Sequence, residues 1–178
     1  MDIFSSDEVL RVLALAMEES ADDWLLMAVT FIYALRRAEA VSLKADNLDA
    51  DYLVLKRGKG SKMVKRKLLV HENPLLNIRE ALLEKARTTR WNQRLFPISP
   101  RTFQRRVHYY GEKVGLPKFL CHPHTFRHSI IQFLRDSGME LEEIQGISGH
   151  VSLDSLRVYL HPQPAVIESK FNHALQGV

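Results

Sequence analysis

One cysteine and three histidines lie within the nine-residue stretch Cys121–Ser129, whose sequence is CHPHTFRHS. Cys121, His124 and His128 follow one another at intervals of three and four residues, so a turn or a helix could present them to one metal ion. Arg127 lies in the same stretch, however, and a guanidinium cation beside a metal ion is repelled by it. The stretch alone therefore leaves open whether it forms a metal site or a site of another kind.

Composition limits the classes of protein that have to be considered. The chain has 178 residues, a net charge of +4 and a pI of about 9.3, which suggests one domain and favours a polyanionic partner such as nucleic acid. Its single cysteine excludes an intramolecular disulfide, and its N-terminus lacks the basic and apolar pattern of a signal peptide. The most apolar window, residues 24–35, is shorter than the ~20 residues needed to cross a bilayer. We expect a cytoplasmic protein without a membrane partner.

Periodicity and capping residues predict a mainly helical protein. Ser5 and Glu8 form a potential capping box before an amphipathic helix over residues 5–20. Residues 21–35 are apolar on nearly every face and predict a buried helix, with a further helical turn after a bend at residues 36–48. Later helices are predicted at 73–88, with Pro74 near its start, and at 99–115, 124–138, 140–147, 152–160 and 165–175. Residues 52–55 and 67–70 flank a glycine- and lysine-rich turn and predict a β-hairpin.

Five short motifs occur in order along these elements. They are ALRRAE with Arg36, GKGSK with Lys59, HTFRH with His124 and Arg127, SGH with His150, and VYL with Tyr159. Each is common alone, but together they resemble the catalytic domain of the tyrosine recombinase (phage integrase) family. The resemblance covers nearly the whole chain. It implies a mainly α fold with a small antiparallel β-sheet (α+β), and a single catalytic domain over residues 1–178 that lacks the family's N-terminal core-binding domain.

The resemblance also implies a reaction, the cleavage and rejoining of DNA strands through a 3′-phosphotyrosyl intermediate. Tyr159 would attack the phosphodiester, and Arg36 and Arg127 would stabilise the charge that develops on the phosphate oxygens. Lys59 would protonate the leaving 5′ oxygen, although Lys56, Lys62 and Lys65 are alternative donors.

Two histidines complete the implied set. His124 would act as a base or orienting group, and His150 would donate a hydrogen bond to a phosphate oxygen. Because the phosphotyrosine conserves the bond energy, the resemblance implies no metal and no other cofactor. On this interpretation the stretch 121–129 is not a metal site, since His124 and Arg127 share one helical face aimed at a phosphate.

The implied partner is double-stranded DNA, with self-association of the protein on that DNA. We expect DNA contacts from basic residues of the hairpin and of the helix at 99–115, namely Arg57, Lys62, Arg101, Arg105 and Arg106. Glu39 is expected to orient Arg36 or the backbone beside it. Two residues depart from the family pattern: Ala34 replaces a glycine and Ser148 replaces a leucine.

Three alternative functions remain at this stage. A type IB topoisomerase would use the same chemistry, a DNA-binding regulator would have lost catalysis, and a zinc-stabilised domain would use the stretch 121–129 as ligands. The presence of all five motifs at compact spacing favours the recombinase.

Overall fold

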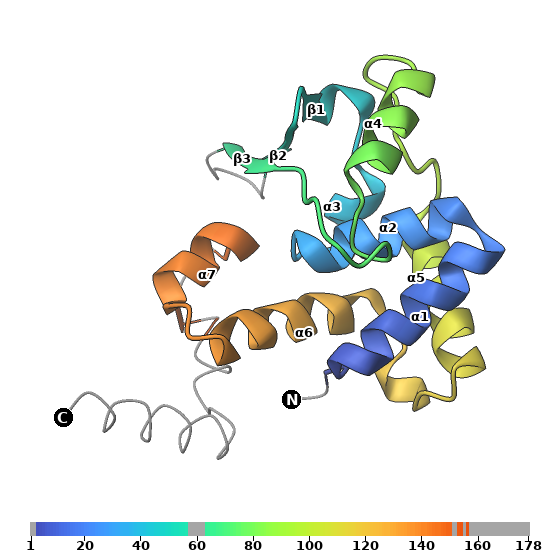
Figure 1. Ribbon diagram of the computed structural model, residues 1–178, viewed down its shortest axis with the longest axis vertical. Coiled ribbons are helices and arrows are strands. Elements are labelled where there is room, and N and C mark those ends of the chain that lie inside the picture. The colour runs from blue at the N-terminus through green and yellow to red at the C-terminus, as the bar shows by residue number, and fades with distance from the viewer. Residues whose placement is uncertain (1–2, 57–62, 151–152, 155, 157–178) are drawn as a thin grey trace. The chain divides into compact units, whose positions relative to one another are not determined.

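The computed structural model describes residues 3–56, 63–150, 153–154 and 156. The chain divides into two compact units, Asp2–Ile130 and a second one that comprises Ile131–Val178 and Met1. They are described separately below (Figure 1). The predicted fold class is confirmed, because the described elements are helices with one small three-stranded antiparallel sheet. The single-domain assignment stays a prediction.

The first unit begins with two packed helices, α1 (Ser6–Glu19) and α2 (Ala21–Ile32), which lie side by side (Figure 1). The predicted capping box of α1 is present: the Ser5 side chain accepts from the Glu8 N–H, and the Glu8 carboxylate accepts from the Ser5 N–H. Every residue of α2 from Asp23 to Phe31 is buried, as its all-round apolar sequence predicts. This helix forms the centre of the unit.

Helix α2 ends earlier than predicted, in a turn that leads directly to the arginine motif. The Ala34 N–H donates to the Phe31 carbonyl and the Leu35 N–H to the Thr30 carbonyl, which is the Schellman pattern of a helix end. Ala34 has φ of 50°, in the left-handed region where glycine is favoured. This geometry explains why the related pattern has glycine there. The short helix α3 (Arg37–Val41) follows.

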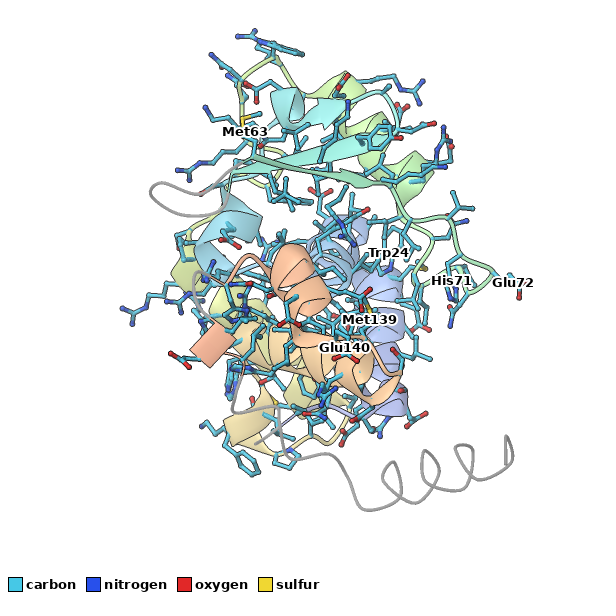
Figure 2. All side chains as sticks on the ribbon, turned by 90° about the vertical axis from the view of Figure 1, so that its left-hand side faces the viewer. Trp24, Met63, His71, Glu72, Met139 and Glu140 are labelled. Carbon is cyan, nitrogen blue, oxygen red and sulfur yellow. The ribbon has the colours of Figure 1, made fainter. Side chains whose placement is uncertain are left out.

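The sheet has the order β1 (Leu48–Asp49), β2 (Tyr52–Lys56) and β3 (Met63–Lys67), and all neighbours are antiparallel. The hairpin of β2 and β3 was predicted, but its second strand was placed at residues 67–70, which was wrong. Tyr52 pairs with Lys67, so the strand is the polar segment before that apolar run. Side chains of β3 are exposed or half-buried, as for Met63 in Figure 2, so this edge strand needs no apolar face.

The predicted start of the next helix was also wrong. Pro74 opens only a turn, which the Asn73 side chain stabilises by accepting from the Leu75 N–H at 3.0 Å. Helix α4 (Arg79–Thr88) starts after this turn. The buried Trp24 donates to the Leu75 carbonyl at 2.9 Å and so attaches the turn to α2, while the neighbouring His71 and Glu72 lie exposed on the surface (Figure 2).

Helix α5 (Pro100–Lys113) begins and ends as predicted, with Ser99 as its N-cap and Gly115 at φ of 79° beyond its end. It approaches the short helix η2 (Lys118–Leu120) so closely that a methyl group on Gly111 would lie 2.4 Å from the Cys121 sulfur. Asp23, buried on α2, accepts hydrogen bonds from Arg106 and from the Tyr110 hydroxyl, and this network fixes α5 against the central helix.

The predicted helix over 124–138 is α6 (Pro123–Asp136), which starts in the first unit and continues into the second. In the second unit, α7 (Leu141–Ser148) ends at Gly149, whose φ of 65° is left-handed. The helix predicted over 165–175, and most of the one over 152–160, lie outside the described residues. Within the described part of the chain, no helix combines the length and apolar character that a membrane span requires.

Candidate active site

The predicted catalytic residues fall into three groups. Arg36, His124 and Arg127 belong to the first unit, and His150 belongs to the second. Lys59 and Tyr159 lie outside the described residues, as do the predicted DNA contacts Arg57 and Lys62.

Arg36 is held by Glu39 at the start of α3. Its Nη1 lies 2.9 Å from Oε1 of Glu39, and its backbone N–H donates to the other carboxylate oxygen at 2.8 Å. The Arg36 side chain is 37% exposed and the Glu39 side chain is 17% exposed, so the pair reaches the surface and the arginine is its more exposed member. The expected orienting role of Glu39 is confirmed by these two contacts.

Arg127 is buried more deeply than any other predicted cation that the structure describes, with 2% of its surface exposed. It lies one turn into α6, and its Nη1 donates a hydrogen bond to the Ala34 carbonyl. Ala34 lies two residues before Arg36, in the left-handed turn at the end of α2. This hydrogen bond therefore joins the two arginine motifs, although 93 residues separate its partners.

His124 lies exposed at the start of α6, three residues before Arg127. Partial desolvation lowers its pKa below the ordinary histidine value, and the positive charges of Arg127, Arg37 and Arg36 contribute to the same decrease. A histidine whose pKa is lowered from 6.5 is mainly neutral at pH 7. The first unit thus gathers two guanidiniums and a neutral imidazole.

A second imidazole supports His124. The ring of His128 stacks on it with centroids 5.9 Å apart and an interplanar angle of 29°. Burial, together with the positive charges of the neighbouring His124 and Arg127, lowers the pKa of His128 to about 4. His128 is therefore neutral at pH 7 and adds no charge beside the two arginines.

This lowered pKa predicts a loss of stability in acid. In the unfolded chain His128 takes up a proton as the pH falls below the ordinary pKa of 6.5. In the folded chain it does so only near pH 4. Unfolding should therefore become easier as the pH falls through this window. We expect the urea midpoint of the wild type to fall more steeply between pH 6.5 and 4.5 than that of His128→Gln. His71→Gln, which removes an exposed loop histidine, is the matched control, and equal slopes in all three proteins would contradict the prediction.

The cysteine and histidine stretch is arranged unlike a metal site. Cys121 is buried with its sulfur 3.3 Å from the Pro117 carbonyl, and burial raises the pKa of its thiol. His122 contacts the Thr125 hydroxyl at 3.2 Å, while His124 and His128 stack on each other. Among the described residues, no three His, Cys, Asp or Glu side chains converge in a way that could hold a metal ion.

His150 follows α7 in the second unit. Its Nδ1 lies 2.6 Å from the Ser148 hydroxyl, and its carbonyl accepts from the Gln145 amide at 3.0 Å. Ser148 is one of the two departures from the family pattern. Its hydroxyl here orients the His150 ring, which a leucine could not do by hydrogen bonding.

The three predicted DNA-contacting arginines of α5 differ in their surroundings. Arg101 and Arg105 are exposed, one turn apart on the same face of the helix. Arg106 instead forms an ion pair with the buried carboxylate of Asp23. This ion pair holds α5 against α2. The contact to Asp23 spans 83 residues and carries no local sequence signal.

Arg37 was not predicted from the sequence as a catalytic or DNA-binding residue. It is exposed beside Arg36, its Nη1 donates to Gln104 Oε1 on α5 at 3.3 Å, and its charge acts on His124. The doubled arginine of ALRRAE was the available signal, but adjacent identical residues do not indicate which of them faces which neighbour.

Comparison with known proteins now connects this geometry to a family. The family model described as the phage integrase family matches residues 3–165. The chain belongs to the phage integrase family. Among relatives of this family, the tyrosine recombinase XerA of Pyrococcus horikoshii is 26% identical over 97% of the chain, and XerC of Pseudomonas fluorescens is 32% identical over 88%. The chain spans 63% and 54% of the lengths of these two relatives.

Solved structures of phage integrase relatives have the same fold. A crystal structure of XerA recombinase superposes with a TM-score of 0.74 at 20% identity, covering 98% of this chain and 65% of that one. The catalytic domain of bacteriophage HP1 integrase gives a TM-score of 0.67 at 18% identity, covering 97% of this chain and 94% of that one. XerH, in a pre-cleavage complex with its difH substrate, gives 0.69 at 25% identity, covering 89% and 50%.

Proposed function

We propose that this chain is the catalytic part of a tyrosine site-specific recombinase, which cleaves and rejoins duplex DNA through a 3′-phosphotyrosyl intermediate. The observation that carries the proposal is the convergence of Arg36, Arg127 and a neutral His124 from the α2–α3 turn and α6. Membership of the phage integrase family and the difH substrate bound by the XerH site-specific recombinase support it.

Two guanidiniums suit the phosphoryl transition state. As Tyr159 attacks phosphorus, negative charge grows on the non-bridging oxygens, and arginine remains protonated throughout and offers a planar fork of donors. Glu39 and the Ala34 carbonyl hold Arg36 and Arg127 in place before the substrate arrives. Preorganised donors of this kind contribute about 3 kcal/mol each to lowering the barrier.

The histidines and Lys59 then divide the proton transfers. A neutral His124 can accept a proton from Tyr159, which an imidazolium could not do, or it can orient the Tyr159 hydroxyl. The Ser148 hydroxyl, when it donates to Nδ1 of His150, leaves the proton on Nε2, and that N–H can donate to a phosphate oxygen. Lys59 protonates the departing 5′ oxygen.

Bond energy is conserved in the intermediate. The tyrosine–phosphorus bond replaces the bond to the 5′ oxygen, and attack by a 5′ hydroxyl reverses the exchange, so neither ATP nor a metal enters the cycle. Arg101 and Arg105 contact the DNA backbone, and copies of the protein assemble on DNA in the cytoplasm.

The assignment of Lys59 as general acid can be tested with a modified leaving group. We expect Lys59→Ala to slow cleavage by about 10²-fold or more on an ordinary substrate, and much less on one with a 5′-bridging sulfur, because a thiolate leaves without a proton. Cleavage rates on both substrates are the measurement.

Lys65→Ala is the matched control for this experiment. The Lys65 ammonium lies 2.6 Å from Asp49 Oδ2 and 4.7 Å from the centre of the Tyr52 ring, so it is already engaged on the sheet. If Lys59→Ala slows both substrates equally, Lys59 only positions DNA and the acid is another residue.

A further inference from the structure

A polar strip runs along one exposed face of α5 toward the candidate active site. Arg101, Gln104, Arg105 and His108 recur at the three- and four-residue spacing that puts side chains on one helical face. Arg101 and Arg105 are exposed, and among the described residues neither has a hydrogen bond or an ion pair. From the middle of the strip, Gln104 reaches Arg37 at the start of α3.

Arg37 differs from its two neighbours in how its charge is balanced. Arg36 is paired with the Glu39 carboxylate, and Arg127 is buried against the Ala34 carbonyl. Arg37 is exposed and donates to the neutral amide of Gln104, and within the described ranges no carboxylate pairs with it. It therefore presents a full positive charge to solvent, at the junction between the strip and the site.

The Gln104 amide, which accepts a hydrogen bond from Arg37, is fixed by a second hydrogen bond. Gln104 Nε2 donates to the Cys121 carbonyl at 3.4 Å, which directs Oε1 of the same amide toward the Arg37 guanidinium. Gln104 thus connects the start of α3 with the segment that precedes α6. A guanidinium fixed in this way is preorganised for an anion rather than free to rotate.

The position of Arg37 favours a phosphate other than the one that reacts. Arg36 is the N-cap of α3 and has extended backbone angles, whereas Arg37 is the first helical residue, so the two side chains leave the chain in different directions. Arg36 and Arg127 are the cations proposed for the reacting phosphate, whereas Arg37 donates to Gln104 on the α5 strip. Its charge also acts on His124, so the strip lies close to the candidate site. A DNA strand offers a further phosphate at each ~3.4 Å of its axis, so adjacent cations can bind adjacent phosphates.

We propose that Arg37 binds the DNA backbone phosphate next to the one held by Arg36 and Arg127, and that Gln104 positions its guanidinium for this contact. The inference rests on the proposed function, because it takes the ligand of the neighbouring arginines to be a DNA phosphodiester. The rival explanation is that Arg37 only cross-links α3 to α5. Loss of a cross-link of this kind would lower stability and leave DNA affinity unchanged, whereas loss of a phosphate contact would lower DNA affinity.

Salt dependence of DNA binding separates these two roles. Each phosphate neutralised by a protein cation adds about 0.9 to the slope of log affinity against log salt concentration. A short fluorescent duplex is titrated with the full chain between about 50 and 200 mM salt. The variants are Arg37→Ala, Arg37→Lys and Gln104→Ala, and Arg87→Ala is the control. The Arg87 side chain is 69% exposed on α4. Arg87→Ala removes one positive charge, as Arg37→Ala does, but from a different part of the surface.

We expect Arg37→Ala to reduce the slope by about one unit and to weaken binding at low salt by about tenfold or more. Arg37→Lys should keep the slope but bind more weakly than the wild type, since a lysine retains the charge without the fork. Gln104→Ala should weaken binding without changing the slope, and Arg87→Ala should match the wild type in both.

An unchanged slope in Arg37→Ala, accompanied by a lower melting temperature, would overturn the proposal in favour of the cross-link. A slope that falls equally in Arg37→Ala and Arg87→Ala would also overturn it, because general electrostatics would then account for the loss. Both outcomes are read from binding and melting alone. Failure of the wild type to cleave DNA, measured separately, would count against the proposed function and not against the phosphate contact.

Discussion

Replacement of Arg127 by lysine is expected to slow DNA cleavage by about 10²-fold or more, equivalent to about 3 kcal/mol of transition-state stabilisation. The guanidinium has two tasks, because its Nη1 donates to the Ala34 carbonyl and the same group is proposed to stabilise the phosphate. A lysine ammonium is a single point on a flexible chain and cannot serve both partners in this geometry. The measurement is the single-turnover cleavage rate at saturating DNA.

Two comparisons make the Arg127 result specific. Arg87→Lys, on the exposed face of α4, should cleave at the wild-type rate. Urea unfolding of Arg127→Lys must also be recorded, because the substitution can remove the hydrogen bond to the buried Ala34 carbonyl at a cost of about 1–3 kcal/mol. A folded Arg127→Lys protein that cleaves at the wild-type rate would contradict the role given to the two arginines.

Replacement of Tyr159 by phenylalanine is expected to abolish the covalent protein–DNA complex while leaving DNA affinity nearly unchanged. Only the nucleophilic oxygen is lost, and the proposed phosphate contacts come from arginines elsewhere in the chain. The complex is measured on denaturing gels with a nicked duplex whose cleaved fragment diffuses away, and affinity is measured separately under native conditions.

Tyr109→Phe serves as the control for this second experiment. Tyr109 is exposed on α5 and contacts Lys113, whose ammonium lies 4.8 Å from the centre of its ring. Its variant should form the covalent complex as the wild type does. A Tyr159→Phe protein that still forms the complex would remove Tyr159 as the nucleophile.

Local signals in the sequence predicted much of the fold. The Ser5–Glu8 capping box and the Ser99 cap each involve residues within one helical turn, so the sequence nearby contains the whole interaction. The start of α4 and the position of β3 were predicted wrongly for the opposite reason. Pro74 is compatible with a turn as well as with a helix, and β3 is chosen by its pairing with β2 rather than by its own hydrophobicity.

In the candidate site, too, local sequence signals were informative and long-range contacts could not be predicted. Motif order singled out Arg36, His124 and Arg127, which belong to one unit, and Glu39 was expected to orient Arg36 or the backbone beside it. The Ala34 carbonyl as partner of Arg127, and Asp23 as partner of Arg106, could not be predicted, because each contact joins segments more than 80 residues apart. Such contacts depend on how helices pack, which a single sequence does not specify.

The most direct test is to locate the DNA on the protein. The full chain is incubated, in excess EDTA, with nicked duplexes that carry a randomised centre, and trapped adducts are digested with trypsin and nuclease. The account predicts a nucleotide attached through its 3′ phosphate to the tryptic peptide 158–170, in which Tyr159 is the sole tyrosine. Attachment to peptide 107–113, which contains Tyr109 and Tyr110, or a requirement for a metal ion in adduct formation, would contradict it.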